Sequence, residues 1–458
     1  MFPRHVFREY DIRGLHATEL DDTLAESVGR AFADLIHETE GGRDIALGLD
    51  VRPSSVRIGE AVTRGLEQAG YVVHRVGVVP TPALYYAVHR LKLDGGMQIT
   101  GSHNPPEFNG FKMVRRGAPV FGRDIQKMAD DIVTGRLPSG GGGHRKPVEI
   151  LDDYRAMLFE RLRVPHGLRV VMDCGNGCAG TVVPGVFEAM GHTVYPLFAE
   201  LDGNFPNHLP DPTVPALLVD LQAEVKRRGA DLGIGFDGDA DRIGAVDGQG
   251  RIVYGDQLLA LFARDVLTRV PGGEIIFDVK CSQGLVEDIR AHGGRPTMWK
   301  TGHSLIKSKL QESGAPLAGE MSGHMFFSEG FFGFDDALFA AGRLLRYVAA
   351  SGRTFSQLVD SIPAYCATPE TRLACAEDRK FAVVEELKRE FTGRFPIIDI
   401  DGVRVEFGDG WGLVRASNTQ PVLVVRFEAR TPARLEEIRA TFMEPLRRLG
   451  VGEATVGH

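Results

Sequence analysis

A serine in the hexapeptide TGSHNP, residues 100–105, could act as a nucleophile on a stiff loop. The two consecutive prolines that begin at its last position restrict the backbone, and a residue before proline is biased towards extended geometry. The loop would therefore hold the Ser102 hydroxyl in one orientation. His103 and Lys112 are candidates to neutralise an anion or to move a proton. A rigid surface turn is the alternative for this segment taken alone.

The pentapeptide DGDAD, residues 237–241, places three carboxylates at alternate positions. Negative charges this close repel one another unless a cation lies among them. Gly238 lets the backbone curl, so that Asp237, Asp239 and Asp241 could converge. Oxygen ligands favour Mg²⁺, Ca²⁺ or Mn²⁺ over zinc, and three carboxylates leave coordination positions open for a phosphate. A solvated acidic turn is the alternative.

The same spacing also begins the calcium loop of an EF-hand, but the later positions exclude that motif. An EF-hand loop needs glycine at its sixth position and glutamate at its twelfth. Counted from Asp237, those positions hold Arg242 and Gly248, and a strand pattern follows in place of a helix. The acidic cluster therefore indicates another kind of divalent-metal site.

Two further segments carry groups that could bind a phosphorylated sugar. RASNTQP, residues 415–421, concentrates hydrogen-bond donors, and neither the segment nor its near neighbours contain a competing carboxylate. An arginine fork beside hydroxyl and amide donors suits a phosphate dianion. GEMSGH, residues 319–324, offers Glu320 and Ser322, which suit the vicinal hydroxyls of a sugar. Each segment alone could be a polar turn, but the four motifs together indicate phosphoryl transfer on a phosphosugar.

The elements that position these motifs follow an alternating α/β pattern. Apolar strands such as residues 43–50 and 273–282 alternate with amphipathic helices such as residues 57–70. Ligands of open α/β sheets bind outside the C-terminal ends of the strands, which is where the unusual loops lie. The pattern occurs in three successive units of roughly 100–130 residues each. A different arrangement follows, with helices predicted over 378–391 and 431–449.

The sequence therefore predicts an α/β fold of three related domains with mixed sheets, followed by a smaller C-terminal α+β domain. A glycine-rich stretch at residues 136–147 is a linker candidate, and a second joint lies near residues 361–373. The expected domains are 1–147 with the serine loop, 148–250 with the metal loop, 251–364 with the sugar-binding loop, and 365–458 with the phosphate-binding segment.

Composition limits the classes of function that remain. The 458 residues carry a net charge of −8, which gives no indication of binding to nucleic acid or to an acidic membrane. No apolar run is long enough to span a bilayer, and no signal-peptide pattern opens the chain. The five cysteines are scattered, as in a protein with reduced thiols, and Cys174 and Cys178 lack the partners of a zinc site. We therefore expect a soluble, cytoplasmic protein.

In order and spacing, TGSHNP, DGDADR and GEMSGH resemble the motifs of the α-D-phosphohexomutase superfamily, specifically its bacterial phosphomannomutase/phosphoglucomutase branch. The resemblance extends from FREYDIRG, residues 7–14, to RASNTQP. It implies three related α/β domains and a TATA-binding-protein-like C-terminal domain around a central cleft.

The activity implied by the resemblance is the reversible interconversion of hexose 1-phosphate and hexose 6-phosphate, of mannose or glucose. It would proceed through a phosphoserine enzyme and a 1,6-bisphosphate intermediate. One Mg²⁺ per chain is implied, with glucose or mannose 1,6-bisphosphate as activator. The expected partner is the phosphohexose, with neither nucleic acid nor membrane, and the expected state is a monomer.

The resemblance also assigns roles to single residues. Ser102 would be the phosphoserine and would bind the metal together with Asp237, Asp239 and Asp241. The expected catalytic residues are Ser102, His103, Lys112, Arg13 and His324. The expected substrate-binding residues are Tyr10, Arg242, Lys280, His303, Glu320, Ser322, Arg415, Ser417, Asn418 and Thr419. The sequence does not decide which of Lys112, Arg13 and His324 is the general base.

Three alternatives remain at this stage. A phosphoglucosamine mutase would keep the chemistry, but that branch resembles GEQSGH where this chain has Met321. A phosphosugar hydrolase would release inorganic phosphate without an added acceptor. A non-catalytic binding protein would not need the intact Ser102 and the aspartate cluster.

Overall fold

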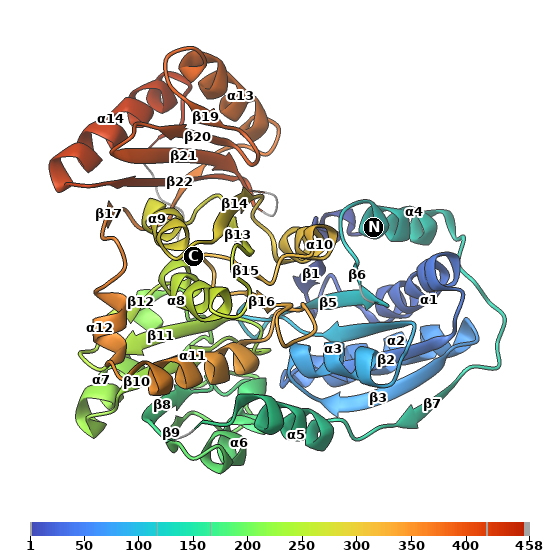
Figure 1. Cartoon of the computed structure of the whole chain (residues 1–458). Helices are drawn as coiled ribbons and strands as arrows, with labels where there is room; N and C mark the ends of the chain where they lie inside the picture. Colours follow the sequence, from blue (N-terminus) through green and yellow to red (C-terminus); the bar gives the residue numbers. More distant parts are fainter. Residues whose placement is uncertain (1, 117, 165, 418–419, 453–458) are drawn as a thin grey trace.

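The computed structural model describes residues 2–116, 118–164, 166–417 and 420–452. These residues form four sheets, each built from one continuous stretch of the chain. Figure 1 shows the four units as successive colours from blue to red, with the red C-terminal unit above α9 and β14.

The first unit is built on a seven-stranded mixed sheet with the order β1-β5-β4-β2-β3-β7, and β6 pairs with β5. Strands β3, β2 and β4 are parallel, whereas β5 is antiparallel to β4. The strands are β1 (Ile12–Leu15), β2 (Asp44–Leu49), β3 (Val72–Val78), β4 (Gly95–Ile99), β5 (Phe108–Arg115), β6 (Ala118–Pro119) and β7 (His144–Pro147). Its helices are α1 (Asp22–Glu40), α2 (Pro53–Gln68), α3 (Thr81–Arg90) and α4 (Arg123–Thr134).

The second unit has a five-stranded sheet with the order β12-β11-β10-β8-β9. Strands β9, β8 and β10 are parallel, and β11 is antiparallel to β10. The strands are β8 (Arg169–Asp173), β9 (Thr193–Leu197), β10 (Leu232–Phe236), β11 (Ile243–Asp247) and β12 (Ile252–Val253). Its helices are α5 (Leu151–Leu162), α6 (Val183–Ala189) and α7 (Val219–Arg228).

The third unit has a four-stranded sheet with the order β14-β13-β15-β16. Strands β14, β13 and β15 are parallel, and β16 is antiparallel to β15. The strands are β13 (Glu274–Asp278), β14 (Arg295–Trp299), β15 (Leu317–Gly319) and β16 (Met325–Phe327). Its helices are α8 (Gly255–Leu267), α9 (Gln283–Ala291), α10 (His303–Ser313), α11 (Ala337–Ser351) and α12 (Phe355–Val359).

The C-terminal unit is an antiparallel sheet with the order β17-β22-β21-β20-β19, and β18 also pairs with β22. The strands are β17 (Cys366–Ala367), β18 (Thr371–Ala374), β19 (Ile397–Ile398), β20 (Val403–Glu406), β21 (Gly410–Ala416) and β22 (Val422–Ala429). Helices α13 (Lys380–Phe391) and α14 (Pro432–Arg448) pack on this sheet and enclose a separate hydrophobic core.

The same strand arrangement recurs in the first three units. In each, three adjacent parallel strands, of which the earliest in the chain is central, are followed by a fourth, antiparallel strand. The repeat relates the three units in topology as well as in class. The predicted fold class of three related α/β domains and a smaller C-terminal α+β domain is thereby confirmed.

One hydrophobic core extends through parts of the first three units. Tyr85 and Tyr86 of α3 reach out of the first unit, where Tyr85 contacts Phe334 at 5.6 Å between ring centroids and Tyr86 contacts Tyr154 at 5.8 Å. Aromatic pairs at these separations contribute beyond the area that they bury. Residues of this shared core, Phe236 and Ile243, flank the metal loop, whereas Ile99 and Phe111, which flank the serine loop, belong to a second core within the first unit. The C-terminal unit has a third core.

Two features differ in detail from the linker and boundaries expected from the sequence. The last four residues of the glycine-rich stretch 136–147 form β7, which pairs in parallel with β3. This pairing needs only backbone groups, so a segment with four exposed side chains can make it. Strand β12 pairs with β11, which extends the second sheet to Val253. The four domain boundaries themselves stay predictions.

Helices α1 and α2 cross at glycines, which gives a test of the packing. A Cβ atom on Gly65 would lie 2.1 Å from the carbonyl oxygen of Glu26. Because backbone cannot easily move away, we expect Gly65→Ala to cost about 1–3 kcal/mol and to lower the melting temperature. Gly140→Ala, where an added Cβ would meet nothing within 4 Å, is the matched control. Calorimetry that gave equal melting temperatures for the two variants would contradict the close helix contact.

Candidate functional site

A cavity of about 890 Å³ lies between the units and is lined by residues of all four. The loops that follow β4, β10, β13 and β15 face it, as expected for strand ends of α/β sheets. The predicted site residues that line it are Tyr10, Arg13, Ser102, His103, Lys112, Arg242, Lys280, His303, Glu320, Ser322, His324, Arg415 and Ser417. The predicted Asn418 and Thr419 lie outside the described residues.

Ser102 lies in the cavity wall in a constrained backbone conformation. Its φ of 51° is in the left-handed region, which a residue with a side chain adopts only when its surroundings enforce it. Its hydroxyl donates a hydrogen bond to Asp237 Oδ2 at 2.8 Å and lies 3.2 Å from His103 Nδ1. The serine side chain is therefore aimed at the acidic loop of the second unit.

The buried arginine that enforces this conformation has no motif in the sequence. Arg52 donates to four carbonyl oxygens of the loop and of β5. They belong to Ser102 at 2.9 Å, Asn104 at 2.5 Å, Pro105 at 2.6 Å and Phe108 at 3.0 Å. Its Nε lies 3.1 Å from Asp50 Oδ2. Burial lowers the pKa of Arg52, and Asp50 opposes that shift. Sequence inspection missed this group because nothing in its neighbourhood signals contact with a loop fifty residues later.

The three aspartates of residues 237–241 converge, as the alternating spacing predicts. All three are fully buried, and their carboxylates come within 4.8 Å of one another. Asp237 Oδ1 accepts the backbone N–H groups of Asp241 and Arg242, both at 3.0 Å. A Cβ atom on Gly238 would lie 2.4 Å from the carbonyl oxygen of Ser102, so only glycine allows this approach of the two loops.

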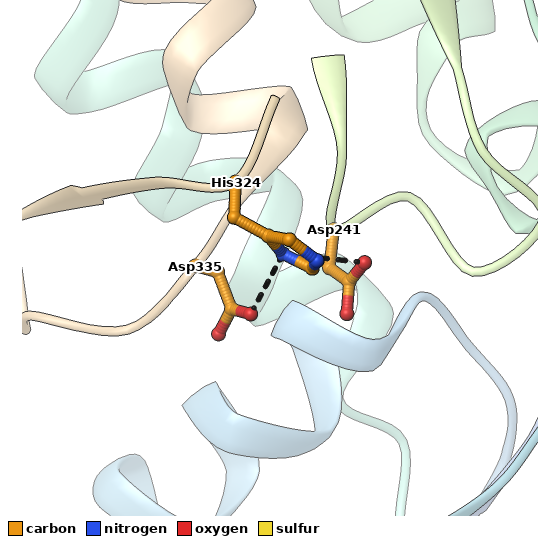
Figure 2. A group of neighbouring side chains, drawn as sticks. All are labelled: Asp241, His324 and Asp335. Carbon is orange, nitrogen blue, oxygen red and sulfur yellow. Dashed lines mark ion pairs between the residues drawn. The ribbon is translucent and has the colours of Figure 1, made fainter. Parts of the chain in front are cut away.

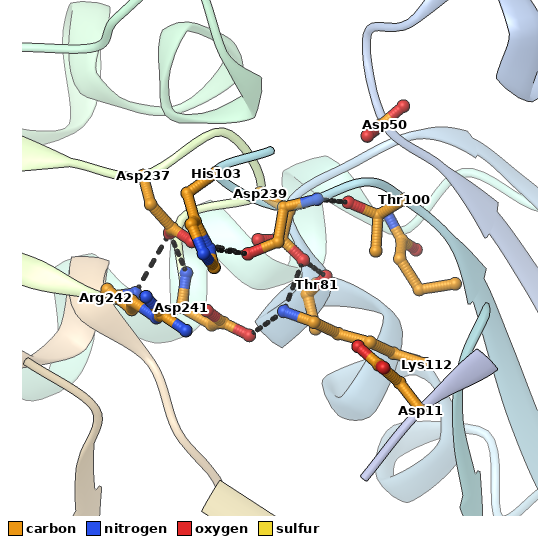
Figure 3. A network of polar contacts seen from close by, with 12 residues as sticks. Asp11, Asp50, Thr81, Thr100, His103, Lys112, Asp237, Asp239, Asp241 and Arg242 are labelled. Atoms are coloured by element: carbon orange, nitrogen blue, oxygen red, sulfur yellow. Dashed lines mark hydrogen bonds and ion pairs between the residues drawn. The ribbon is translucent and has the colours of Figure 1, made fainter. Parts of the chain in front are cut away.

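Lys112 balances part of the negative charge. Its ammonium group donates to Asp239 Oδ2 at 2.8 Å and to Asp241 Oδ2 (Figure 3). Burial raises the pKa of Asp237 well above its usual value, and the neighbouring Asp241 and Asp239 carboxylates raise it further. Burial also favours the neutral form of Asp239, but Lys112 and Thr81 overcome it and lower that pKa. Lys112 thus bonds two of the three carboxylates, and Arg242 and Arg13 add positive charge nearby.

Two oxygen atoms of this cluster identify a possible acidic metal site. Asp239 Oδ1 and Asp241 Oδ1 are buried, and neither has a hydrogen-bond partner among the described residues. A buried carboxylate oxygen without a partner is costly unless a cation or donor meets it. The donor set of this chain therefore fits a hard divalent cation.

A second cluster joins His324 to two carboxylates (Figure 2). His324 Nδ1 lies 3.1 Å from Asp335 Oδ2 and 3.7 Å from Asp241 Oδ1, and its Nε2 accepts from Arg242 Nε at 2.9 Å. This network assigns the proton of a neutral His324 to Nδ1. Asp335 was not predicted from the sequence, because only the antiparallel turn between β16 and α11 brings it to the histidine.

Asp335 is already neutralised by protein groups. Lys307 Nζ lies 2.7 Å from Asp335 Oδ1, and His303 stacks on His324 with ring centroids 5.2 Å apart. Burial would raise the pKa of Asp335, but Lys307, His324 and His303 together hold it well below its usual value. The same three side chains that could geometrically hold a metal, Asp241, His324 and Asp335, therefore already have a resident cation.

The loop GEMSGH turns tightly against the second unit. Gly323 has a φ of 90°, and a Cβ there would lie 2.3 Å from the carbonyl oxygen of Ile243. Glu320 Oε1 accepts from the Gly302 backbone N–H at 2.6 Å, which fixes its carboxylate in the cavity wall. Burial raises the pKa of Glu320. Ser322 lies on the same turn, half-buried and facing the cavity.

The C-terminal unit completes the cavity with Arg415 and Ser417. Arg415 Nε donates to Asp401 Oδ2 at 3.0 Å, and the same oxygen accepts from Thr301 N at 3.0 Å. Tyr10 of the first unit donates to the Thr301 carbonyl at 2.9 Å. The local sequence has no carboxylate to compete for Arg415, but the fold supplies Asp401 from the preceding loop. The expectation that no carboxylate competes for Arg415 is therefore wrong. Asp401 is fourteen residues away in the sequence, but the pairing of β20 with β21 brings it close.

Lys280 links the third unit to the C-terminal unit. Its ammonium group donates to Glu370 Oε2 at 3.1 Å and lies 3.8 Å from Asp278 Oδ2. Burial would lower the pKa of Lys280, but Glu370 and Asp278 outweigh it and raise that pKa. With Arg13, Arg242 and Arg415, this lysine is among nine lysines and arginines that line the cavity, against seven aspartates and glutamates, a small positive excess in a protein of net charge −8. The lining therefore offers cations to an anionic ligand.

Four sequence models of one family match successive parts of the chain. They are described as phosphoglucomutase/phosphomannomutase α/β/α domain I (residues 4–137), domain II (152–250), domain III (254–365) and the C-terminal domain (370–444). The chain belongs to the phosphoglucomutase/phosphomannomutase family. The resemblance inferred from the motifs is thereby confirmed.

Relatives in the family match over nearly the whole chain. A phosphomannomutase/phosphoglucomutase of Pseudomonas aeruginosa is 47% identical over 97% of this chain and 96% of its own length. A phosphoglucomutase of Neisseria gonorrhoeae is 45% identical over 96% of each chain. The crystal structure of a phosphoglucomutase/phosphomannomutase family protein of Burkholderia thailandensis is 42% identical, has a TM-score of 0.93, and is matched over 99% of this chain and 100% of its own.

Among the described residues, no helix combines the length and the apolar character that crossing a bilayer requires.

The Arg52 contacts predict how the serine loop responds when the arginine is removed. Arg52→Met would free the loop carbonyls and leave Asp50 buried without its cation, a change that costs about 3–5 kcal/mol for buried pairs. We expect faster amide hydrogen exchange in the peptide that spans residues 100–109, measured by mass spectrometry, and a lower melting temperature.

Arg57→Met is the matched control for this experiment. Arg57 also bonds a carboxylate, that of Asp22, and the carbonyl oxygens of His16 and Leu20, but it lies at the surface. Its replacement should leave exchange of the serine loop unchanged. Equal exchange rates in Arg52→Met and the wild-type protein would show that the loop holds its shape without the arginine.

Proposed function

We propose that this protein is a phosphohexomutase, which reversibly interconverts hexose 1-phosphate and hexose 6-phosphate, of glucose and mannose. The observation that carries the proposal is the Ser102 hydroxyl, hydrogen-bonded to Asp237 at the wall of a cavity whose lining offers cations. The 47% and 45% identical relatives, named phosphomannomutase/phosphoglucomutase and phosphoglucomutase, support the same activity.

Ser102 acts in this proposal as the carrier of the phosphoryl group. The 6-hydroxyl of a hexose 1-phosphate attacks the phosphorus of phospho-Ser102, so that an O–P bond forms to the sugar and the bond to Ser102 Oγ breaks. The hydroxyl proton passes to a base, and Ser102 Oγ takes up a proton. The 1,6-bisphosphate then turns, and its 1-phosphate returns to Ser102 by the reverse set of bond changes. Hexose 6-phosphate is released.

We further propose Mg²⁺, one per chain, as the cation of the acidic loop. Asp237, Asp239 and Asp241, with the phosphate on Ser102, would hold it. When bound, the ion supplies Lewis-acid stabilisation of phosphate charge. The Oδ1 atoms of Asp239 and Asp241, which have no hydrogen-bond partner among the described residues, support this assignment.

The cationic groups of the cavity would stabilise the transferring phosphoryl group. Lys112, Arg13 and Arg242 line the cavity close to the serine loop, and Arg13 Nη1 donates to Asn104 Oδ1 of that loop at 2.8 Å. Such preorganised charges stabilise the transition state without reorganisation. The Ser102 hydroxyl is within hydrogen-bond distance of His103 as well as of Asp237, so His103 can exchange a proton with it. His324 is also a catalytic residue in this proposal, as one of the candidates for the general base.

The remaining predicted residues would bind the sugar and its other phosphate. Glu320 and Ser322 supply acceptors for sugar hydroxyls. Arg415 and Ser417, with Asn418 and Thr419, would hold the phosphate that does not react, and Tyr10, Lys280 and His303 complete the substrate contacts. The C-terminal unit has its own main core and packs on the third unit through a small apolar cluster of Val279, Trp411 and Leu413. In this proposal a shift at that contact closes the unit over the substrate and excludes water.

Three further properties follow from the scheme. Glucose or mannose 1,6-bisphosphate would act as activator, because either can return a phosphoryl group to unmodified Ser102. We propose a monomer, because one chain supplies all the groups that line the cavity. A cytoplasmic location accords with five free cysteines, which a reducing compartment maintains.

Replacement of Ser102 tests the phosphoserine scheme. We expect Ser102→Ala to lose at least about three orders of magnitude of kcat, measured as conversion of glucose and mannose 1-phosphates with glucose 1,6-bisphosphate present. Ser356→Ala is the matched control, because Ser356 is also buried and donates to an aspartate, Asp247, at 2.8 Å. Full mutase activity in Ser102→Ala would refute the scheme.

The same assay separates the two alternative enzymes. Glucosamine 1-phosphate, run beside the other two sugars, would be the preferred substrate of a phosphoglucosamine mutase. A phosphosugar hydrolase would release inorganic phosphate as fast as it consumed substrate. We expect neither outcome from the wild-type protein.

A further inference from the structure

Thr81 gives both of its hydrogen-bond donors to one residue of the acidic loop. Its hydroxyl donates to Asp239 Oδ2 at 2.5 Å, and its backbone N–H donates to the Asp239 carbonyl oxygen at 2.9 Å (Figure 3). The two residues are 158 positions apart and belong to different units. A hydroxyl that donates to an ionised carboxylate makes a charge-assisted hydrogen bond, which is stronger than one between neutral groups.

The two carboxylate oxygen atoms of Asp239 differ in their contacts. Oδ2 accepts from Thr81 and from Lys112, whereas Oδ1 is buried and has no hydrogen-bond partner in the described parts of the chain. A carboxylate held through one oxygen cannot rotate freely about its terminal bond. The other oxygen is therefore kept available for a cation.

Lys112 alone is not a sufficient anchor for this carboxylate. Its ammonium group is shared between Asp239 and Asp241, and it lines the cavity, where a phosphorylated substrate would compete for it. Thr81 is fully buried and does not line the cavity. When Lys112 turns to the substrate, Thr81 remains as the side chain that holds Asp239 Oδ2.

The position of Thr81 in its helix strengthens the contact. Thr81 is the first residue of α3, a ten-residue helix, so its N–H has no partner within the helix. The N-terminal end of a helix also carries partial positive charge, which favours a nearby carboxylate. The start of α3 thus fastens the metal loop of the second unit to the first unit.

We propose that Thr81 is a positioning residue for the metal ligand Asp239, which it orients so that Oδ1 faces the divalent cation. The inference rests on the proposed function only in taking residues 237–241 as the cation site. Orienting groups behind metal ligands typically change metal affinity by about 10–100-fold when they are removed. Thr81 has that relation to Asp239.

Metal binding to the full chain, measured without turnover, tests the proposal. Mn²⁺ serves as a paramagnetic substitute in titrations of the metal-free protein followed by electron paramagnetic resonance, and calorimetric titration with Mg²⁺ repeats the measurement. We expect Thr81→Val, which keeps the shape and loses the hydroxyl, to bind Mn²⁺ about 10–100-fold more weakly than the wild-type protein. Thr81→Ser, which restores the hydroxyl, should bind within a few-fold of wild type.

A matched control separates orientation from general damage to the core. Thr63 is also fully buried in a helix of the first unit, and its hydroxyl donates to the carbonyl oxygen of Gly59 at 2.7 Å. Thr63→Val removes a buried hydroxyl without touching a carboxylate and should leave Mn²⁺ affinity unchanged. Thermal melting of each metal-free variant checks that it is folded, and Thr81→Ala replaces Thr81→Val if the latter is not.

The outcomes distinguish this inference from the proposed function. Weak binding in Thr81→Val, with rescue by Thr81→Ser and no effect of Thr63→Val, supports the positioning role. Wild-type affinity in Thr81→Val overturns that role and leaves the metal site intact. A wild-type protein that binds neither Mn²⁺ nor Mg²⁺ overturns the metal site of the proposed function and, with it, this inference.

Discussion

The structure depends on bringing three buried carboxylates against one serine across the boundary between two units. Asp237, Asp239 and Asp241 are fully buried, and their mutual repulsion is only partly offset by Lys112. Such an arrangement requires a backbone that holds it rigidly, and a bound cation would offset the repulsion that remains. The close approach of Gly238 to the Ser102 carbonyl shows how little space separates the two loops.

Packing and buried hydrogen bonds in the rest of the molecule provide that rigidity. One apolar core extends through parts of the first three units, and Tyr85 and Tyr86 of α3 join it from the first unit. Arg52 and Thr81 then fix the two loops locally through buried hydrogen bonds. The C-terminal unit meets the third unit through ion pairs such as Lys280 with Glu370 and through a small buried apolar cluster of Val279, Trp411 and Leu413.

Sequence alone gave the motifs and fold class, because local chemistry and strand periodicity are visible in single segments. The sequence showed Asp237, Asp239 and Asp241 as a site, because three carboxylates within five residues repel one another unless a cation lies among them. Arg52, Thr81, Asp335 and Asp401 were missed, because each acts on a residue far away in the chain and none belongs to a chemically unusual stretch. The strand at residues 144–147 was not predicted, because its backbone pairing with β3 leaves no pattern in the side chains.

The role of Ser102 as a phosphoryl carrier is tested most directly by locating the phosphate. Intact-mass measurement and peptide mapping of the wild-type protein, before and after incubation with glucose 1,6-bisphosphate and Mg²⁺, give the amount and position of any modification. A gain of one phosphoryl group, confined to the peptide that contains Ser102, is the expected result. No phosphate on that peptide under any condition, or phosphate on another residue, would contradict the proposed chemistry.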